Sequence, residues 1–250
     1  MMINLSRVPN ESIIGMVMRL PLRLIPPSTV FYIIQGKLKG KKWIVGSSTH
    51  GCWLGTYEYK KQIFFSKMIK EGSIVYDIGA HVGFYTLLSS SLVGPKGKVF
   101  SFEPSPRNIH YLKQHLRLNG CDNVRIIEAA VTDKDGIAFF EECTPSLLGH
   151  ISINGNLKVK TLSLDSLFLK GEIPVPDYIK IDAEGSELLI LAGAKNILTN
   201  YNPMLILSIH SPELYNGCYE FLKFLNYDLQ SLDENKDVNN AYELLAYKRR

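Results

Sequence analysis

The stretch SIVYDIGAHVGFYT at Ser73–Thr86 predicts a buried β-strand that runs into a glycine-rich turn and then into a helix. The β-branched and aromatic residues at positions 74–76 are typical of a central strand. Gly79 and Gly83 allow a sharp turn and a close approach of the backbone to a ligand, because neither carries a Cβ atom. The stretch therefore predicts the nucleotide-sized pocket of an α/β protein.

An acid within this stretch indicates which kind of ligand the turn favours. Asp77 lies at the end of the strand, just ahead of Gly79. In a dinucleotide-binding turn, a carboxylate inside the loop would repel the pyrophosphate that the helix N-terminus binds. A carboxylate here favours a ligand with a cationic or hydrogen-donating group, and S-adenosylmethionine carries both an ammonium and a sulfonium group. A plain strand–helix turn without a ligand is the alternative.

A second acid follows at the spacing at which Rossmann-like units bind a ribose. The predicted strand 98–103 ends in Glu103, about 20 residues beyond Gly83. A carboxylate at this spacing accepts hydrogen bonds from the ribose hydroxyls. An exposed acid at a strand end is the alternative. The apolar period that follows predicts a helix over residues 108–119.

Small residues follow the third predicted strand, 124–128. Ala129, Ala130 and Val131 leave room for a flat ring, so we predict that Ala130 contacts an adenine. The turn signal DKDG at Asp133–Gly136 comes shortly after them and also predicts an ordinary β-turn.

The fourth and fifth predicted strands, residues 177–182 and 204–209, end in residues that can do chemistry. Asp182 and Glu184 follow the fourth strand, and His210 follows the fifth. The carboxyl ends of parallel strands meet at one edge of an open sheet, which is where such sheets bind ligands. We therefore predict that Asp182, Glu184 and His210 border the reaction site.

The roles of these three residues stay open at the level of sequence. The two carboxylates can hold a metal ion, accept a proton or pair with a cation. Glu184 and the nearby Glu187 can instead complement the positive end of the following helix, and His210 can be structural. Asp182, Glu184 and His210 are all candidates for a general base.

Predicted strands recur about every 25 residues with helical patterns between them, which predicts one doubly wound parallel sheet. The C-terminal part adds strands at 227–231 and 242–247, joined by a polar connection. The expected fold is a Rossmann-like, mainly parallel sheet of seven strands whose last strand is antiparallel. Residues 136–175 are expected to form strands or a hairpin that shapes a substrate pocket, with a mobile loop at 146–156.

Six stretches of the sequence, taken together, resemble one known family. The chain is similar to FkbM-type S-adenosylmethionine-dependent methyltransferases between about residues 50 and 210. The stretches are HGCWLGTYE at 50–58, YDIGAHVGFYTL at 76–87, FEPSPRN at 102–108, EAAVTDKDG at 128–136, TLSLD at 161–165 and IKIDAEGSE at 179–187.

The resemblance implies S-adenosyl-L-methionine as methyl donor and a hydroxyl of a sugar, glycan or natural-product scaffold as acceptor. It implies that Asp77, Gly79 and Gly83 form the cofactor turn, that Glu103 is the ribose acid, and that Asp182 and Glu184 lie at the edge of the active site. We also expect His81, Ala130 and Asp182 to contact the cofactor. The chain has His81 where the usual turn has a third glycine. It has Ser208 where the family often has an acid before the terminal histidine, so the resemblance supplies no carboxylate partner for His210.

Two other functions remain open. A glycosyltransferase-like enzyme would use Asp182-Ala183-Glu184 as an acidic metal-binding motif for a nucleotide sugar. The methyltransferase interpretation includes no metal site. A non-catalytic module that binds the cofactor without turnover is the second alternative.

Length and cysteine content agree with one main domain. A chain of 250 residues, 46% of them hydrophobic, can bury one sizeable core. We expect an N-terminal extension over residues 1–70 that covers the cofactor pocket, and a methyltransferase domain over 71–250. The four cysteines show no C-x-x-C or paired spacing, so they predict neither a zinc site nor an oxidising compartment, and the cytoplasm is the expected location.

Positive charge is concentrated in the N-terminal part. Residues 1–72 contain 11 Lys and Arg against 3 Asp and Glu, a net charge of +8. The stretch Ile13–Ile34 is too interrupted by Arg and Pro for a membrane span and has no clear signal-peptide cleavage pattern. The region either covers the cofactor pocket or lies against the anionic inner face of a membrane. No nucleic-acid recognition motif accompanies the basic residues, so we expect no nucleic-acid partner.

Overall fold

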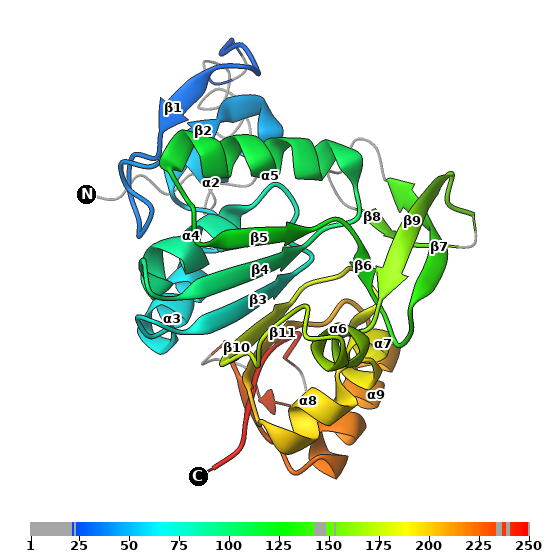
Figure 1. The fold of residues 1–250 in the computed structure, drawn as a ribbon. Helices are drawn as coiled ribbons and strands as arrows, with labels where there is room; N and C mark the ends of the chain where they lie inside the picture. The colour runs from blue at the N-terminus through cyan, green and yellow to red at the C-terminus, as the bar shows by residue number, and fades with distance from the viewer. Residues whose placement is uncertain are drawn as a thin grey trace.

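The computed structural model describes residues 22, 24–142, 149–152, 154–233, 237–238 and 241–249. A seven-stranded sheet forms the centre of the molecule and carries helices on both faces (Figure 1). Its strands, in spatial order, are β12 (Asp228–Ser231), β13 (Glu243–Tyr247), β11 (Met204–Ser208), β10 (Tyr178–Ile181), β3 (Ile74–Ile78), β4 (Lys98–Phe102) and β5 (Val124–Ile127).

The direction of the strands confirms the predicted Rossmann-like fold. Strands β3, β4, β5, β10 and β11 are parallel, and β13 pairs antiparallel with both β11 and β12. The chain leaves β3 toward β4 and β5 and returns on its other side through β10 and β11. The switch point between β3 and β10 is where open α/β sheets bind their ligands.

Strand β3 lies in the middle of the sheet and is buried on both faces. Tyr76 and Ile78 pack into one hydrophobic core, and Val75 packs into the other. Side chains alternate between the faces of a strand, so a parallel strand covered on both sides needs apolar residues at nearly every position. The exception on β3 is Asp77, which is fully buried.

Helices connect the parallel strands and cover the sheet. They are α4 (Phe84–Val93), α5 (Pro106–Asn119), α6 (Leu164–Leu169), α7 (Glu187–Ala192), α8 (Lys195–Asn200) and α9 (Pro212–Phe224). Helix α5 begins two residues before the predicted start. Ser105 caps the helix by accepting a hydrogen bond from the Asn108 N–H, and Pro106 suits the first helical position because it has no N–H to satisfy.

A second sheet stands beyond the end of β5. Its strands, in spatial order, are β6 (Ala130–Val131), β9 (Leu157–Leu162), β7 (Gly136–Glu142) and β8 (Gly149–Ile151). The predicted strands of this region are present. The predicted loop at 146–156 is wrong for residues 149–151, which form β8, while residues 146–148 and 153 lie outside the described residues.

The N-terminal region packs into one of the two cores of the central sheet. It contains β1 (Val30–Tyr32), β2 (Lys42–Ile44), a 3-10 turn at Val45–Ser47, α2 (His50–Leu54) and α3 (Tyr59–Met68). Trp43 is fully buried and stacks on the ring of His115 in α5, with the ring centroids 3.8 Å apart. The extension and the sheet thus share one hydrophobic core, and the division at residue 70 stays a prediction.

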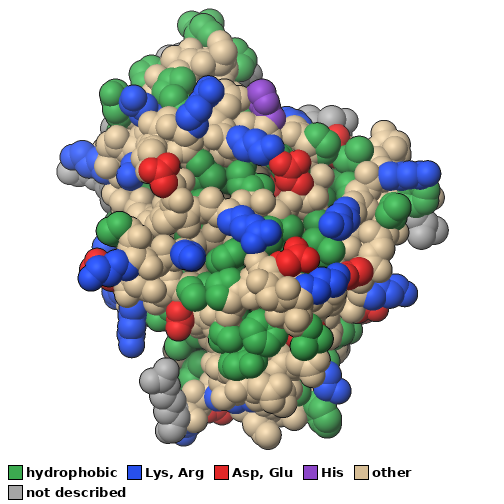
Figure 2. Space-filling view, viewed as in Figure 1, with side chains coloured by type: hydrophobic (Ala, Val, Ile, Leu, Met, Phe, Trp, Pro, Cys, Tyr) green, Lys and Arg blue, Asp and Glu red, His purple; other side chains and the backbone are tan. Residues whose placement is uncertain are grey.

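The hairpin of β1 and β2 exposes hydrophobic side chains. Val30, Phe31, Tyr32 and Ile34 are exposed, and hydrophobic and basic side chains lie together at the top of the view in Figure 2. Among the described residues, no helix combines the length and the hydrophobicity that a membrane crossing requires.

Candidate functional site

A cavity of about 450 Å³ lies at the carboxyl edge of the central sheet. Residues at the ends of four neighbouring parallel strands line the cavity, as the sequence predicted. The strand-end residues are Gly79 and His81 after β3, Glu103 after β4, Ala129 and Ala130 after β5, and Asp182 and Glu184 after β10. The N-terminal extension adds Ser48, Thr49, Cys52 and Tyr57.

The two glycines of the turn after β3 are required by the packing of the protein itself. Gly79 has φ +72°, and an added Cβ atom would lie 1.8 Å from the backbone oxygen of Asp182. Gly83 has φ +94°, and its added Cβ would lie 2.4 Å from Leu112 Cδ1. His81 keeps the left-handed backbone at φ +53°, an uncommon conformation for a residue with a side chain that often marks a functional turn.

Asp77 lies behind the wall of the cavity. Its carboxylate accepts a hydrogen bond from Thr86 Oγ1 at 2.7 Å and forms an ion pair with Lys180 Nζ at 3.3 Å. The side chain is fully buried, and Asp77 is not among the residues that line the cavity. A direct contact between Asp77 and the cationic groups of a ligand, as predicted from the sequence, does not fit this placement. Asp77 instead balances the charge of Lys180.

Glu103 faces the cavity and is held in place by the turn after β3. One carboxylate oxygen accepts a hydrogen bond from the backbone N–H of His81 at 2.8 Å, and the other accepts bonds from the Ser105 N–H and Asn108 Nδ2. Burial raises the pKa of Glu103 to about 7, although these hydrogen bonds act in the opposite direction. The two bonds to one oxygen use both of its lone pairs, whereas the oxygen that accepts from His81 keeps one lone pair for a ligand. The ribose contact stays a prediction.

Apolar side chains surround the predicted adenine position. Ala130 lines the cavity together with Ala129 and with two residues of the second sheet, Phe140 on β7 and Ile151 on β8. The sequence indicated strands in that region but not which of their faces turns toward the cavity. Phe140 and Ile151 were therefore missed, because the pairing of β7 with β8 and β9 decides their orientation.

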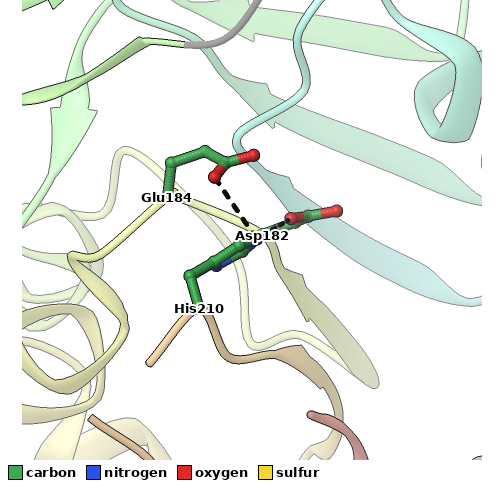
Figure 3. A group of neighbouring side chains, drawn as sticks. All are labelled: Asp182, Glu184 and His210. Carbon is green, nitrogen blue, oxygen red and sulfur yellow. Dashed lines mark ion pairs between the residues drawn. The ribbon is translucent and has the colours of Figure 1, made fainter. Parts of the chain in front are cut away.

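The structure brings Asp182, Glu184 and His210 together (Figure 3). His210 Nε2 lies 3.4 Å from Asp182 Oδ1 and 3.5 Å from Glu184 Oε2. Among the described residues, these three side chains form a group whose donor atoms all lie within 4.8 Å of one another and could hold a metal ion. Burial raises the pKa of Glu184. Burial also acts to raise the pKa of Asp182, but Lys180 and Lys61 lower it below its usual value.

His210 has a carboxylate partner that the sequence did not reveal. Its Nδ1 donates a hydrogen bond to Oε1 of Glu187, 2.8 Å away, and this bond raises the pKa of His210. Glu187 is the first residue of α7 and is fully buried. The sequence offered Glu187 only as a complement to the helix end, and Ser208 put a carboxylate partner of His210 in doubt. Only the docking of α7 beside the end of β11 creates the pair.

Lys61 is a second residue that the sequence analysis missed. From α3 it donates to Ser208 Oγ at 2.7 Å and forms ion pairs with Glu243, Asp182 and Glu58 at 2.9, 3.7 and 3.5 Å. Burial acts to lower the pKa of Lys61, but these carboxylates raise it above its usual value. No local pattern identifies Lys61, because its partners lie on distant strands.

Glu58, at the end of the quoted stretch HGCWLGTYE, joins this network to the cavity. It accepts a hydrogen bond from the hydroxyl of Tyr85 at 2.8 Å, and Tyr85 lines the cavity. Glu58 has φ +43°, so it shares the left-handed backbone of His81 and of Glu184 at φ +48°. Three residues at or beside the cavity thus adopt a conformation that costs free energy, which is common at functional sites.

The model of the methyltransferase FkbM domain matches residues 77–236, which is more than half of the chain. The chain belongs to the FkbM methyltransferase family. The matched range contains the predicted cofactor turn, Glu103 and the Asp182–Glu184–His210 cluster. It begins after α3, so Lys61 and Glu58 lie outside it.

Two curated methyltransferases and one solved structure are similar to this chain. The hexuronic acid methyltransferase AglP of Haloferax volcanii is 31% identical over 145 residues, 57% of this chain and 58% of AglP. The 2-O-methyltransferase NoeI of Sinorhizobium fredii is 26% identical over 172 residues, 61% of this chain and 69% of NoeI. The crystal structure of an FkbM methyltransferase from Methylobacillus flagellatus has a TM-score of 0.56 at 18% identity, over 76% of this chain and 47% of that one, which shows a shared fold.

Proposed function

We propose that the protein is an S-adenosylmethionine-dependent O-methyltransferase that acts on a hydroxyl group of a sugar or glycan. The observation that carries the proposal is one cavity, at the switch point of the sheet, that is lined by Glu103 as well as by Asp182 and Glu184. The family match supports methyl transfer. The names of the two relatives, a hexuronic acid methyltransferase and a 2-O-methyltransferase, support a sugar hydroxyl as the acceptor.

The residues of the cavity fit S-adenosylmethionine. Glu103 offers a carboxylate oxygen for a ribose hydroxyl, at the position where Rossmann-like folds bind a ribose. Ala130, Phe140 and Ile151 offer apolar surface for the adenine. Asp182, ionised because two lysines lower its pKa, adds negative charge to the wall of the cavity, which favours a cationic ligand over an anionic one.

When bound, S-adenosylmethionine supplies a methyl group on a cationic sulfur that an acceptor oxygen displaces in line. The chain's own residues bind and orient the two reactants. In model systems such positioning lowers a barrier by about 7–11 kcal/mol. Asp182 and Glu184 line the cavity, and His210 lies next to both. This cluster assists the loss of the acceptor proton, an effect that typically contributes about 10²- to 10⁴-fold to the rate.

Transfer of a labelled methyl group tests the proposal. The protein is incubated with labelled S-adenosylmethionine and oligosaccharides that contain a hexuronic acid, and the acceptor is analysed by mass spectrometry. We expect label in the acceptor and one S-adenosylhomocysteine released for each methyl group transferred. Blocking the sugar hydroxyls beforehand should abolish the transfer.

Binding measurements on the same protein separate the alternatives. Binding of a nucleotide sugar without any binding of S-adenosylhomocysteine would contradict the proposal and favour the glycosyltransferase-like enzyme. Binding of S-adenosylhomocysteine without transfer to any of a panel of hydroxyl acceptors would favour the non-catalytic module.

A further inference from the structure

The Asp182–Glu184–His210 cluster has the composition and the spacing of a metal-binding site. One oxygen of each carboxylate and one imidazole nitrogen lie within 4.8 Å of one another, with His210 Nε2 3.4 and 3.5 Å from the two oxygens. Two ligands held about 2.2 Å from a cation, at angles of about 90° to 110°, lie roughly 3.1–3.6 Å apart. The separations around His210 Nε2 thus suit ligands of one ion.

The hydrogen bond between His210 Nδ1 and Glu187 determines which ring nitrogen of His210 faces Asp182 and Glu184. Glu187 Oε1 accepts from His210 Nδ1 and also from the backbone N–H of Gly185, 3.0 Å away. An ionised carboxylate has no proton to donate, so the proton of the first bond belongs to Nδ1. In the neutral ring, Nε2 then presents its lone pair to Asp182 and Glu184. Metal-binding histidines commonly donate their second ring nitrogen to a carboxylate in this way.

The two carboxylate oxygens of Asp182 have different surroundings. Oδ2 lies 3.7 Å from Lys61 Nζ and 3.5 Å from Lys180 Nζ, whereas Oδ1 faces His210. Among the described residues, no ion pair links either lysine to Glu184. The lysines therefore balance one side of Asp182, while the other side faces Glu184 and His210 Nε2, where either the proton of a charged ring or a bound cation can lie between the two carboxylate oxygens.

Negative charge also exceeds positive charge in the wider network. The carboxylates that take part in its ion pairs are Glu58, Asp77, Asp182, Glu184, Glu187 and Glu243, whereas their partners are Lys61, Lys180 and, when its ring is protonated, His210. A divalent cation would reduce this excess. Two carboxylates and one imidazole suit Mn²⁺, which accepts oxygen ligands together with a histidine.

We infer that Asp182, Glu184 and His210 bind one divalent cation, and that this cation holds two neighbouring oxygens of the sugar acceptor. The role toward the acceptor rests on the proposed methyltransferase function, but the cation binding does not. Three protein ligands leave positions open for a hydroxyl and an adjacent hydroxyl or carboxylate. A hydroxyl bound to the cation loses its proton to water more readily, because the cation stabilises the oxyanion. The sequence led us to expect no metal site, and the proposed cation departs from that expectation.

Mn²⁺ binding to the 250-residue chain, without cofactor or acceptor, tests the inference directly. The protein is treated with a chelator, dialysed and titrated with Mn²⁺, while electron paramagnetic resonance measures the free ion. We expect one Mn²⁺ per chain, with affinity at least 10-fold lower in His210→Ala and Glu184→Gln. The matched controls His110→Ala and Glu128→Gln change exposed residues outside the cluster and should bind Mn²⁺ as the unaltered protein does.

A second test concerns Glu187, which we expect to orient the His210 ring for cation binding. Glu187→Gln keeps the side-chain shape but loses the carboxylate that accepts from His210 Nδ1, so Mn²⁺ affinity should fall about 10-fold or more. Circular dichroism checks that each variant is folded. Equal Mn²⁺ affinity in the unaltered protein and in folded His210→Ala would overturn the inference.

Calorimetric titration with S-adenosylhomocysteine, on the same preparations, keeps the two proposals apart. Binding of S-adenosylhomocysteine without binding of Mn²⁺ would overturn the metal site and leave the proposed function standing. Binding of Mn²⁺ without binding of S-adenosylhomocysteine would support the metal site and contradict the proposed function.

Discussion

The backbone carbonyl of Asp182 occupies the space that a Cβ atom on Gly79 would fill. An added Cβ would lie 1.8 Å from that oxygen, so the turn after β3 and the end of β10 can approach each other only if residue 79 is glycine. This contact joins the predicted cofactor turn to the predicted catalytic edge. A change at Gly79 should therefore affect both.

We expect Gly79→Ala to lower the free energy of unfolding and to abolish binding of S-adenosylhomocysteine, because the end of β10 must move away. Gly72→Ala is the matched control, since Gly72 has φ +81° and no atom within 4 Å of its added Cβ. It should cost only the backbone strain, about 1–3 kcal/mol. Urea unfolding and calorimetry compare the two variants. Similar losses in both would show that the Asp182 contact is unimportant.

Glu103→Ala should weaken binding of S-adenosylhomocysteine by about 1.5–3 kcal/mol, the usual contribution of hydrogen bonds to a charged group. The ribose hydroxyls would lose their acceptor, while the fold persists. Isothermal titration calorimetry measures the change, with Glu128→Ala as the control because Glu128 is exposed after β5. Unchanged affinity in folded Glu103→Ala would place the ribose elsewhere.

The binding of S-adenosylhomocysteine should also depend on pH through Glu103. Its pKa is raised to about 7 by burial, so a growing share of the side chain is protonated as the pH falls through 7. The ionised form keeps a lone pair for a ribose hydroxyl, whereas the protonated form has lost part of its capacity to accept hydrogen bonds. Affinity should therefore be higher at pH 8 than at pH 6. Glu103→Gln should remove the difference, and the same difference in Glu103→Gln would assign it to another group.

His115 should make the protein sensitive to acid. Its ring is buried against Trp43, bonds the backbone N–H of Ile44 and the carbonyl of Val82, and has a pKa lowered to about 4 by burial. The folded-state pKa lies below the unfolded value of about 6.5, so stability is complete above pH 6.5 and falls as the pH drops toward 4, by at most about 3 kcal/mol.

Thermal unfolding between pH 4 and 7.5 tests this expectation. His115→Asn should be less stable than the unaltered protein at pH 7.5, because the two backbone groups lose a partner, but it should lose less stability on acidification. His110→Asn, a change on the exposed face of the same helix, should keep the acid sensitivity. An unchanged pH profile in His115→Asn would rule out His115 as its source.

Lys61→Met should destabilise the protein by about 3–5 kcal/mol, because it removes the ammonium that pairs with Glu243, Glu58 and Asp182. The neighbouring Lys60 is exposed on the same helix, so Lys60→Met serves as the control and should change stability by less than about 0.5 kcal/mol. Urea unfolding compares them. A Lys61→Met variant as stable as Lys60→Met would show that the network contributes no net stability.

The β1–β2 hairpin should bind anionic vesicles if the N-terminal region contacts a membrane surface. Tyr32 and Ile34 are exposed hydrophobic residues, and Lys37 and Lys39 are exposed beside them. Co-sedimentation with phosphatidylglycerol vesicles should exceed that with phosphatidylcholine and should weaken with salt. Lys37→Glu with Lys39→Glu should reduce it. Absence of binding to anionic vesicles would contradict a membrane location.

The order of the elements and the place of the cofactor turn could be predicted from local patterns. The apolar run ahead of Asp77, the glycines at 79 and 83 and the acid at 103 specify a strand–turn–helix–strand unit, because side-chain alternation and glycine conformation act between near neighbours. The rule that parallel strands end at one edge then placed Asp182, Glu184 and His210 together. The structure confirms that placement.

The partners of these residues were decided by tertiary structure alone. Lys180 pairs with Asp77 because β10 lies beside β3, and Lys61 reaches Ser208 because α3 packs over the end of β11. Glu187 meets His210 through the docking of α7. Such contacts join residues that are distant in the chain, and their geometry depends on strand order and helix packing, which no local pattern encodes. The sequence therefore predicted which edge of the sheet carries the candidate site, and the fold determined how the charges at that edge are balanced.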